Sequence, residues 1–178
     1  MKLKEITKTF WFKILLVSIF AIAMAYLEAA IVIYLRTLFK VAGEIQTIQP
    51  KPQDVLIALP FFAFLQPHHL FTILPESKIL GIELFRQGAT ILMLLTFSWL
   101  VGRSIKEKLA IFLYTFAIWD IFYYLFLYLI LGWPTSLKTL DVLFLVPVPW
   151  VAPVFVPLSI SGVMIIISVY LLRKEYKE

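Results

Sequence analysis

The first candidates for chemistry are charged side chains that stand inside long apolar stretches of the sequence. There are five of them: Glu28, Arg36, Glu83, Arg86 and Asp120. If these stretches cross a membrane, each charge is costly in lipid and should face protein or a water-filled cavity, where it commonly has a function. The set holds one more carboxylate than guanidinium groups, and an acid without a basic partner is a candidate proton-relay group.

The spacing around Glu83 predicts a polar helical face. Arg86 follows Glu83 by three residues and Gln87 follows it by four, while Thr90 lies four residues after Arg86. Residues three and four apart are neighbours on the surface of a helix. One face of the segment 78–101 should therefore carry two opposite charges and two hydrogen-bonding groups.

A second polar face surrounds Asp120, which is the only charged residue in the segment 109–131. Tyr123 and Tyr124 follow it at helical spacing, and Tyr128 lies one further turn along. An acid at the middle of an apolar segment, with phenols beside it, indicates a site that faces the interior of a bundle.

Glu28 also belongs on an interior face. It shares a helical side with three small residues, Ala21, Ala25 and Ala29, and small residues let a second helix approach closely. All these groups fall between the midplane and one surface of the predicted bundle. We therefore expect one binding constellation in its outer half, formed by Glu28, Arg36, Glu83, Arg86, Asp120, Tyr123 and Tyr124.

Two interpretations of this constellation stay open. In the first, its charges only neutralise one another and fix the register of the helices. Arg86 then pairs with Glu83 or Asp120, and Arg36 pairs with Glu28. In the second, the charges form a site for an ion, a proton or a polar headgroup, because ionisable residues in membranes are commonly functional.

Two other groups are weaker candidates. His68 and His69 suggest a metal or haem, but adjacent helical residues point about 100° apart and no further ligand spacing surrounds them. Loop histidines near lipid headgroups are the simpler interpretation. Ser159 and Ser161 faintly suggest a nucleophile, whereas serine in an apolar helix more often serves packing. The chain has no cysteine, which excludes thiolate chemistry and disulfides, and the sequence identifies no cofactor.

The composition indicates a membrane protein. The chain has 178 residues, of which 62% are hydrophobic and 15% are charged, whereas soluble domains are about 45–50% apolar and about 25% charged. The formal charge of +5 does not indicate nucleic-acid binding, because ten of the sixteen Lys and Arg residues lie in three short segments that border apolar runs. These ten are Lys2, Lys4, Lys8, Lys13, Arg103, Lys106, Lys108, Arg173, Lys174 and Lys177.

Basic segments of this kind are typical of the cytoplasmic side of a membrane. They predict an all-α transmembrane bundle, a single integral membrane domain in the cell membrane with both termini in the cytoplasm. About 20 apolar residues are enough to cross a bilayer, and the four predicted spans are 13–37, 78–101, 109–131 and 155–172. A cleaved signal peptide is the alternative for the first span, but its apolar pattern continues to Leu35, longer than such a peptide requires.

Two segments do not fit a spanning helix. Segment 55–65 is too short to cross a bilayer, and we expect it to be interfacial or re-entrant on the outer side. Segment 142–154 contains Pro147, Pro149 and Pro153, and prolines at this density cannot continue a regular helix. Irregular backbone at membrane depth is tolerated only against protein or water. We therefore expect this segment to be irregular and to cover the polar constellation.

Four stretches stand out as a set: YLEAAIVIYLR (26–36), GIELFRQGAT (81–90), WDIFYYLFLYLILGWPTSL (119–137) and DVLFLVPVPWVAPV (141–154). Together they resemble a family of small prokaryotic integral membrane proteins without a characterised activity. WDxxYY and GWPxSL are the most distinctive parts. The resemblance implies a multi-pass membrane protein and supplies no activity.

Three classes of function follow from these observations. The favoured one is a binding or transport protein whose charged pocket opens outward and takes a small ion, a proton, or a polar or lipid headgroup. The alternatives are a structural subunit or assembly factor of a larger membrane complex, and a membrane-embedded enzyme acting from the extracytoplasmic side, for which a carboxylate base is the best available group. Membrane lipid, a homo-oligomer or partner subunits are the expected partners, since four helices are few for alternating access.

Overall fold

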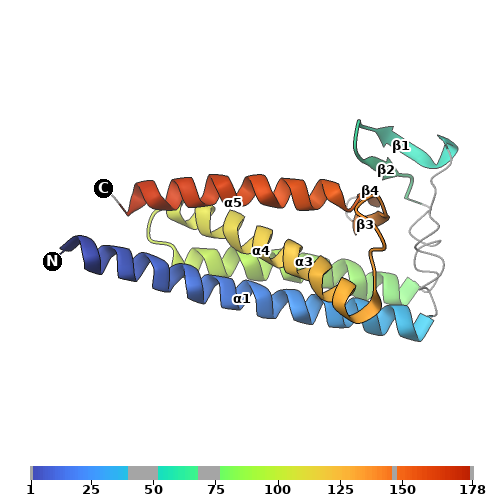
Figure 1. The fold of residues 1–178 in the computed structure, drawn as a ribbon. Helices are drawn as coiled ribbons and strands as arrows, with labels where there is room; N and C mark the ends of the chain where they lie inside the picture. The colour runs from blue at the N-terminus through green and yellow to red at the C-terminus, as the bar shows by residue number, and fades with distance from the viewer. Residues whose placement is uncertain (1, 40–51, 68–76, 146–147, 177–178) are drawn as a thin grey trace.

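Four long helices make up most of the chain, and in the computed structural model they run side by side (Figure 1). The structure describes residues 2–39, 52–67, 77–145 and 148–176. The helices are α1 (Lys2–Phe39), α3 (Ser77–Val101), α4 (Ile105–Leu131) and α5 (Phe155–Glu175). Each contains a segment long and apolar enough to cross a membrane. The predicted all-α class with four apolar spans is confirmed.

Helix α4 is the central helix, because α1, α3 and α5 each pack against it. Small residues make this possible: Ala21 and Ala25 on α1, and Ala117 on α4, are completely buried. Absence of a bulky side chain lets two helix backbones approach closely. Aromatic side chains fill the remaining space, as where the rings of Phe20 on α1 and Phe97 on α3 stack 3.7 Å apart.

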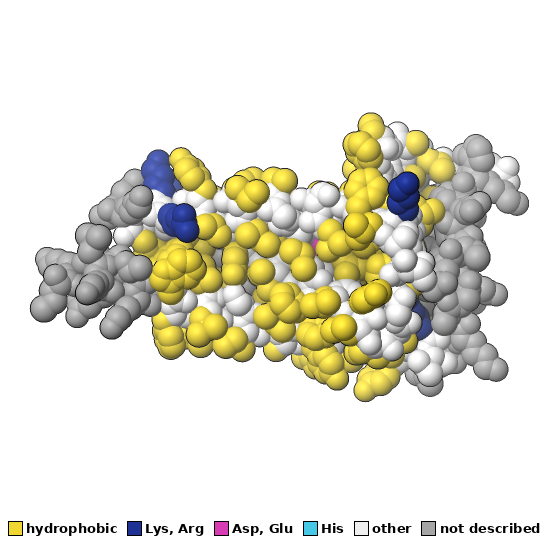
Figure 2. Space-filling view, viewed as in Figure 1, with side chains coloured by type: hydrophobic (Ala, Val, Ile, Leu, Met, Phe, Trp, Pro, Cys, Tyr) yellow, Lys and Arg dark blue, Asp and Glu magenta, His cyan; other side chains and the backbone are white. Residues whose placement is uncertain are grey.

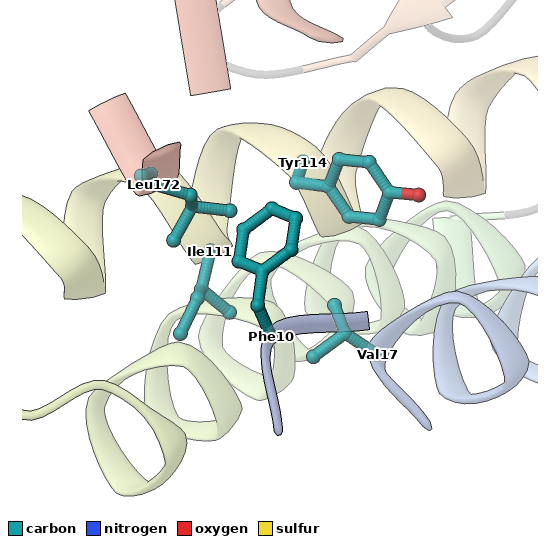
Figure 3. Close-up of a cluster of buried hydrophobic side chains, with 6 residues drawn as sticks. Phe10, Val17, Ile111, Tyr114 and Leu172 are labelled. Atoms are coloured by element: carbon teal, nitrogen blue, oxygen red, sulfur yellow. The ribbon is translucent and has the colours of Figure 1, made fainter. Parts of the chain in front are cut away.

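The ends of the bundle differ, and we name them for what they contain. At the terminal end lie the start of α1, the end of α5 and the turn at residues 102–104 between α3 and α4 (Figure 1). A cluster from three helices, with Phe10, Val17, Ile111, Tyr114 and Leu172, forms the core there (Figure 3). At the sheet end, the other end of the bundle, lies a small β-sheet (Figure 1).

The sheet has four antiparallel strands in the order β1-β2-β4-β3. Strands β1 (Val55–Ala58) and β2 (Ala63–Leu65) form a hairpin that follows the short 3₁₀ helix η2 (Pro52–Asp54). Strands β3 (Leu140–Phe144) and β4 (Trp150–Pro153) come from the chain between α4 and α5. The two pieces join where Ala63 lies opposite Val151.

This sheet corrects one expectation. Segment 142–154 was expected to be irregular, and much of it lies in β3 and β4. Segment 55–65, which was expected to be interfacial or re-entrant, forms the hairpin of β1 and β2. The prolines fit because Pro149 precedes β4 and Pro153 is its last residue, where a missing N–H is tolerated. Pro157 lies in the first turn of α5, whose N–H groups need no helical partner.

The outer surface of the bundle matches a membrane-spanning protein. In Figure 2 apolar side chains cover most of the midsection, and Lys and Arg side chains lie toward the two ends. Large apolar residues with more than half of their surface exposed occur on every helix, for example Leu27, Phe85, Leu129 and Ile166. Such exposure is unusual in water and expected in lipid.

Candidate functional site

A cavity of about 310 Å³ lies at the sheet end, enclosed by all four helices and by strands β3 and β4. Its walls contain every residue of the predicted constellation, which are Glu28, Arg36, Glu83, Arg86, Asp120, Tyr123 and Tyr124. The wall on the side of the sheet is formed by residues 142–145 and Trp150. The volume is within the range of about 300–1,000 Å³ that is usual for small-molecule sites.

Arg86 on α3 is the most fully bonded charge in this cavity. Its Nε donates to both carboxylate oxygens of Glu83, at 3.0 and 2.9 Å, and its Nη2 donates to Glu83 Oε2 at 2.6 Å. Its Nη1 forms an ion pair with Glu28 Oε1 on α1. Thr90 completes the group, because its hydroxyl donates to Glu28 Oε2 at 3.1 Å. These four side chains tie α1 to α3.

This geometry decides between the pairings expected from the sequence. Glu83 pairs with Arg86 as predicted, whereas Glu28 pairs with Arg86 and not with Arg36. Among the described residues Asp120 forms no ion pair with Arg86. Of the two partners expected for Arg86, Glu83 is therefore correct and Asp120 is wrong. Gln87, from the same polar face, accepts a hydrogen bond from the backbone N–H of Leu145 at 3.0 Å and so connects α3 to the chain after β3.

Asp120 lies near the middle of α4 and has a hydroxyl as its partner. Ser161 on α5 donates from Oγ to Asp120 Oδ2 at 2.8 Å, and Ser161 itself is buried. No salt bridge to Asp120 occurs within the part of the chain that the structure describes. The rings of Trp119 and Tyr123, which also line the cavity, stack at a centroid distance of 6.2 Å beside it.

Asp141 on β3 is a fourth carboxylate in the wall of the cavity. The hydroxyl of Tyr124 donates to its Oδ2 at 2.8 Å, and its exposed fraction is only 5%. Burial disfavours the charged form and raises the pKa of Asp141 to about 6, although the hydrogen bond from Tyr124 and the charge of Arg36 act in the opposite direction. Asp141 therefore changes charge close to neutral pH.

Arg36 lies in the last turn of α1 and is 7% exposed. Its guanidinium carbon lies 4.0 Å from the centroid of the Trp133 ring, a cation–π contact. Trp133 is itself buried and follows Gly132, which ends α4 with a φ of 66°. The Nε of Arg36 is buried and has no hydrogen-bond partner.

Sequence reasoning missed two residues of the site, Asp141 and Ser161. Asp141 was not among the candidates, because its position in a buried strand depends on pairing with other parts of the chain. Ser161 was assigned to packing. A signal was present in both cases, since each is a polar residue beside a long apolar run. His68 and His69 lie outside the described residues, and within those residues no three His, Asp or Glu side chains gather as metal ligands would.

Comparisons of the chain with protein family models, with curated proteins and with solved structures give no match. The resemblance seen in the sequence stays a prediction. What the site can do must therefore be argued from its own charges. Among the residues that line the cavity there are four carboxylates, from Glu28, Glu83, Asp120 and Asp141, and two guanidiniums.

Proposed function

We propose that this multi-pass membrane protein binds a small ligand that carries a positively charged nitrogen, and that the cavity at the sheet end is the binding site. The observation that carries the proposal is the state of Asp120. It lies in the cavity wall, its hydrogen bond comes from a neutral hydroxyl, and the charged network of the same cavity, around Arg86, is already complete. A carboxylate in such a place favours a cation as its partner.

The aromatic wall supports the same ligand class. Trp119 is the residue before Asp120, and its ring stacks with that of Tyr123 one turn further along α4. Both rings line the cavity. An ammonium group is attracted to the face of an aromatic ring, most strongly to Trp, and more so where water is excluded. A carboxylate and two aromatic rings together form a suitable site for an organic cation.

The orientation in the membrane is part of the proposal. Basic residues near the terminal end of the bundle, among them Lys13, Lys106 and Arg173, support a cytoplasmic location for that end. The cavity then lies in the outer half of the bilayer. Binding is proposed in preference to transport by a single chain, because alternating access usually requires two sets of helices that move against each other.

The test is a titration of the detergent-purified protein with ethanolamine, followed as the rise in unfolding temperature that a ligand of the native state produces. Asp120→Asn keeps the shape and removes the charge, and should still fold because no ion pair is broken. We expect affinity to fall roughly ten- to hundredfold, the equivalent of a lost charged hydrogen bond. Glu175→Gln, which changes a carboxylate near the terminal end, should leave the titration unchanged.

A finer comparison uses two serines of α5. Ser161→Ala removes the hydroxyl that donates to Asp120, whereas Ser159→Ala removes an exposed hydroxyl that bonds only its own helix, at Phe155 O. We expect Ser161→Ala to weaken ethanolamine binding severalfold and Ser159→Ala to have no effect. The proposal fails if ethanolamine does not bind, or if it binds Asp120→Asn as tightly as the unchanged protein.

A further inference from the structure

A second feature of the same cavity is a group of buried N–H donors without acceptors. Among the residues that line it, three have a buried nitrogen with no hydrogen-bond partner: Arg36 Nε, Trp119 Nε1 and Trp150 Nε1. Buried donors are nearly always satisfied in native proteins, and each exception requires an explanation. A fourth such donor, Trp133 Nε1, belongs to the ring beneath Arg36 and does not line the cavity, so the described part of the protein is short of acceptors around Arg36.

Arg36 is the strongest of these donors. The guanidinium is always charged and presents its N–H groups in a rigid, planar fork that fits phosphate and carboxylate groups. Its guanidinium carbon lies over the Trp133 ring, and its Nε has no hydrogen-bond partner among the described residues. Arg86 cannot serve in the same way, because Glu83 and Glu28 already accept from its Nε, Nη1 and Nη2.

The protein itself offers Arg36 only a partial counterion. Asp141 attracts it electrostatically, but within the described chain the salt bridges of the cavity belong to Arg86. The hydrogen bond of the Asp141 carboxylate comes from Tyr124. A buried guanidinium that stacks on an aromatic ring and lacks a bonded acid is suited to an external anion.

We propose that the ligand is zwitterionic, with a phosphate group bound by Arg36 and an ammonium group bound by Asp120; this inference rests on the proposed function for its cationic half. Both side chains line the same cavity. Asp120 lies about one helical turn before Tyr124, and the ring of Tyr124 lies 6.3 Å from the Trp133 ring over which Arg36 lies. A single ligand in this cavity would contact both charged groups.

O-phosphoethanolamine (aminoethyl phosphate) is the simplest molecule of this kind, and it occurs both free and as the headgroup of phospholipids. The surface around the cavity suits the lipid source. Ile160 on α5 lines the cavity and is 51% exposed. In Figure 2 a small acidic area is visible among the apolar side chains of the midsection. The headgroup could thus reach the cavity while its acyl chains stay on the apolar face.

The experiment compares three water-soluble probes on lipid-depleted protein: ethanolamine, inorganic phosphate and O-phosphoethanolamine. The unchanged protein should bind O-phosphoethanolamine at least about tenfold more tightly than ethanolamine, the fold-change that corresponds to about 1.4 kcal/mol. Arg36→Gln should abolish this difference, so that the variant binds O-phosphoethanolamine no more tightly than ethanolamine. Arg173→Gln, which removes an exposed arginine near the end of α5, should change nothing.

A second variant covers the case in which Arg36→Gln does not fold. Trp150→Phe keeps the aromatic ring that contacts Phe64 and Phe144 but removes its unpartnered N–H. It should reduce the advantage of O-phosphoethanolamine over ethanolamine severalfold. Trp99→Phe is the matched control, because Trp99 is 61% exposed and contacts Lys108 near the terminal end.

The two proposals fail in different ways. Suppose that ethanolamine binds through Asp120 but O-phosphoethanolamine binds no more tightly, or that its higher affinity is retained in both Arg36→Gln and Trp150→Phe. The zwitterionic ligand is then wrong and the proposed function stands. If ethanolamine itself does not bind, the proposed function is wrong.

Native mass spectrometry of the protein from lipid nanodiscs identifies the source of the ligand. Retention of phosphatidylethanolamine over phosphatidylglycerol favours the lipid headgroup. Binding of the free compound alone favours a soluble ligand. Equal retention of both lipids would contradict a role for the ammonium group.

Discussion

The two ends of the bundle both contain buried ionic groups, but among the described side chains unsatisfied buried polar atoms line only the cavity at the sheet end. At the terminal end Lys13 Nζ lies 2.5 Å from Glu107 Oε1, and the backbone N–H of Arg103 donates to the other oxygen of Glu107 at 2.8 Å. Ser104 accepts from the N–H of Glu107 as the cap of α4 and donates to Glu175. Each of these groups has a partner, and the adjoining cavity measures about 10 Å³, too small for anything larger than a water molecule.

The sheet end combines a satisfied network with an unsatisfied one. The group around Arg86 is closed like the terminal network and joins two helices. Beside it, in a cavity about thirty times larger, Asp120 has only a hydroxyl partner and Arg36 Nε has none. Stability alone explains a network in which every polar group has a partner. Polar groups that lack a full partner beside an open cavity indicate a ligand.

The largest effect is expected where the closed network of the sheet end is broken. Arg86→Gln leaves the carboxylates of Glu28 and Glu83 buried, with side chains 12% and 6% exposed, and without a cation. Removal of one partner from a buried ion group typically costs about 3–5 kcal/mol. We expect the free energy of unfolding in detergent to fall by about that amount, measured by chemical denaturation.

The matched change at the terminal end is Lys13→Gln. It removes one ion pair from a lysine whose side chain is 19% exposed, and the backbone N–H of Arg103 still donates to Glu107. The expected loss is about 1–2 kcal/mol.

A control for Arg86→Gln replaces Glu28 and Glu83 by Gln in the same variant, which should restore part of the stability lost by Arg86→Gln. No recovery in that triple variant would mean that the charges were not the cause.

The next effect is a dependence of stability on pH that originates at the sheet end. The pKa of Asp141 is about 6 in the folded protein, against 3.8 in an exposed chain. Between these values the folded state holds the proton more tightly, so the contribution of Asp141 to the free energy of unfolding decreases as pH rises from about 4 to about 6. The shift corresponds to about 3 kcal/mol.

Asp141→Asn tests this value, because the amide can still accept the hydrogen bond from Tyr124 but does not titrate. Its free energy of unfolding should lose this decrease between pH 4 and pH 7, while Glu175→Gln at the terminal end should retain it. The measurement is denaturation of both variants across that pH range. Parallel curves for Asp141→Asn and the unchanged protein would show that Asp141 is not desolvated as the structure indicates.

The helices could be predicted because their signals are local. Apolar runs of sufficient length, bordered by basic residues, placed all four spans close to their observed ends. The difference between the predicted and the observed start of α4 is also local in origin. The helix begins at Ile105 and not at residue 109, because the side chain of Ser104 caps it and its first turn includes charged residues. The sheet could not be predicted, since β2 pairs with β4 across almost ninety residues of sequence, and strands of three to five residues carry little periodic signal.

The same distinction between local and distant contacts applies to the site. The contact between Glu83 and Arg86 follows from spacing on one helix and was predicted. The partner of Glu28 depends on how α1 is rotated against α3, which the sequence does not state, and the expected partner Arg36 was wrong. Asp141 reaches the cavity through a strand, and Ser161 reaches Asp120 through the packing of α5 on α4. Position along the length of the bundle was thus predictable, while partners between helices were not.

The smallest expected effect separates the two tyrosines that follow Asp120 on α4. Tyr124→Phe removes the hydroxyl that donates to Asp141, whereas Tyr128→Phe removes one from a side chain that is 57% exposed. A hydrogen bond to a charged group contributes about 1.5–3 kcal/mol and one between neutral groups about 0.5–1.5 kcal/mol. We therefore expect Tyr124→Phe to cost about 2 kcal/mol at pH 7 and about 1 kcal/mol at pH 4, where Asp141 is protonated. Tyr128→Phe should stay within about 0.5 kcal/mol at both pH values. Denaturation of the two variants at each pH measures these values, and an equal cost for Tyr124→Phe at pH 4 and pH 7 would mean that its hydroxyl does not stabilise the charged form of Asp141.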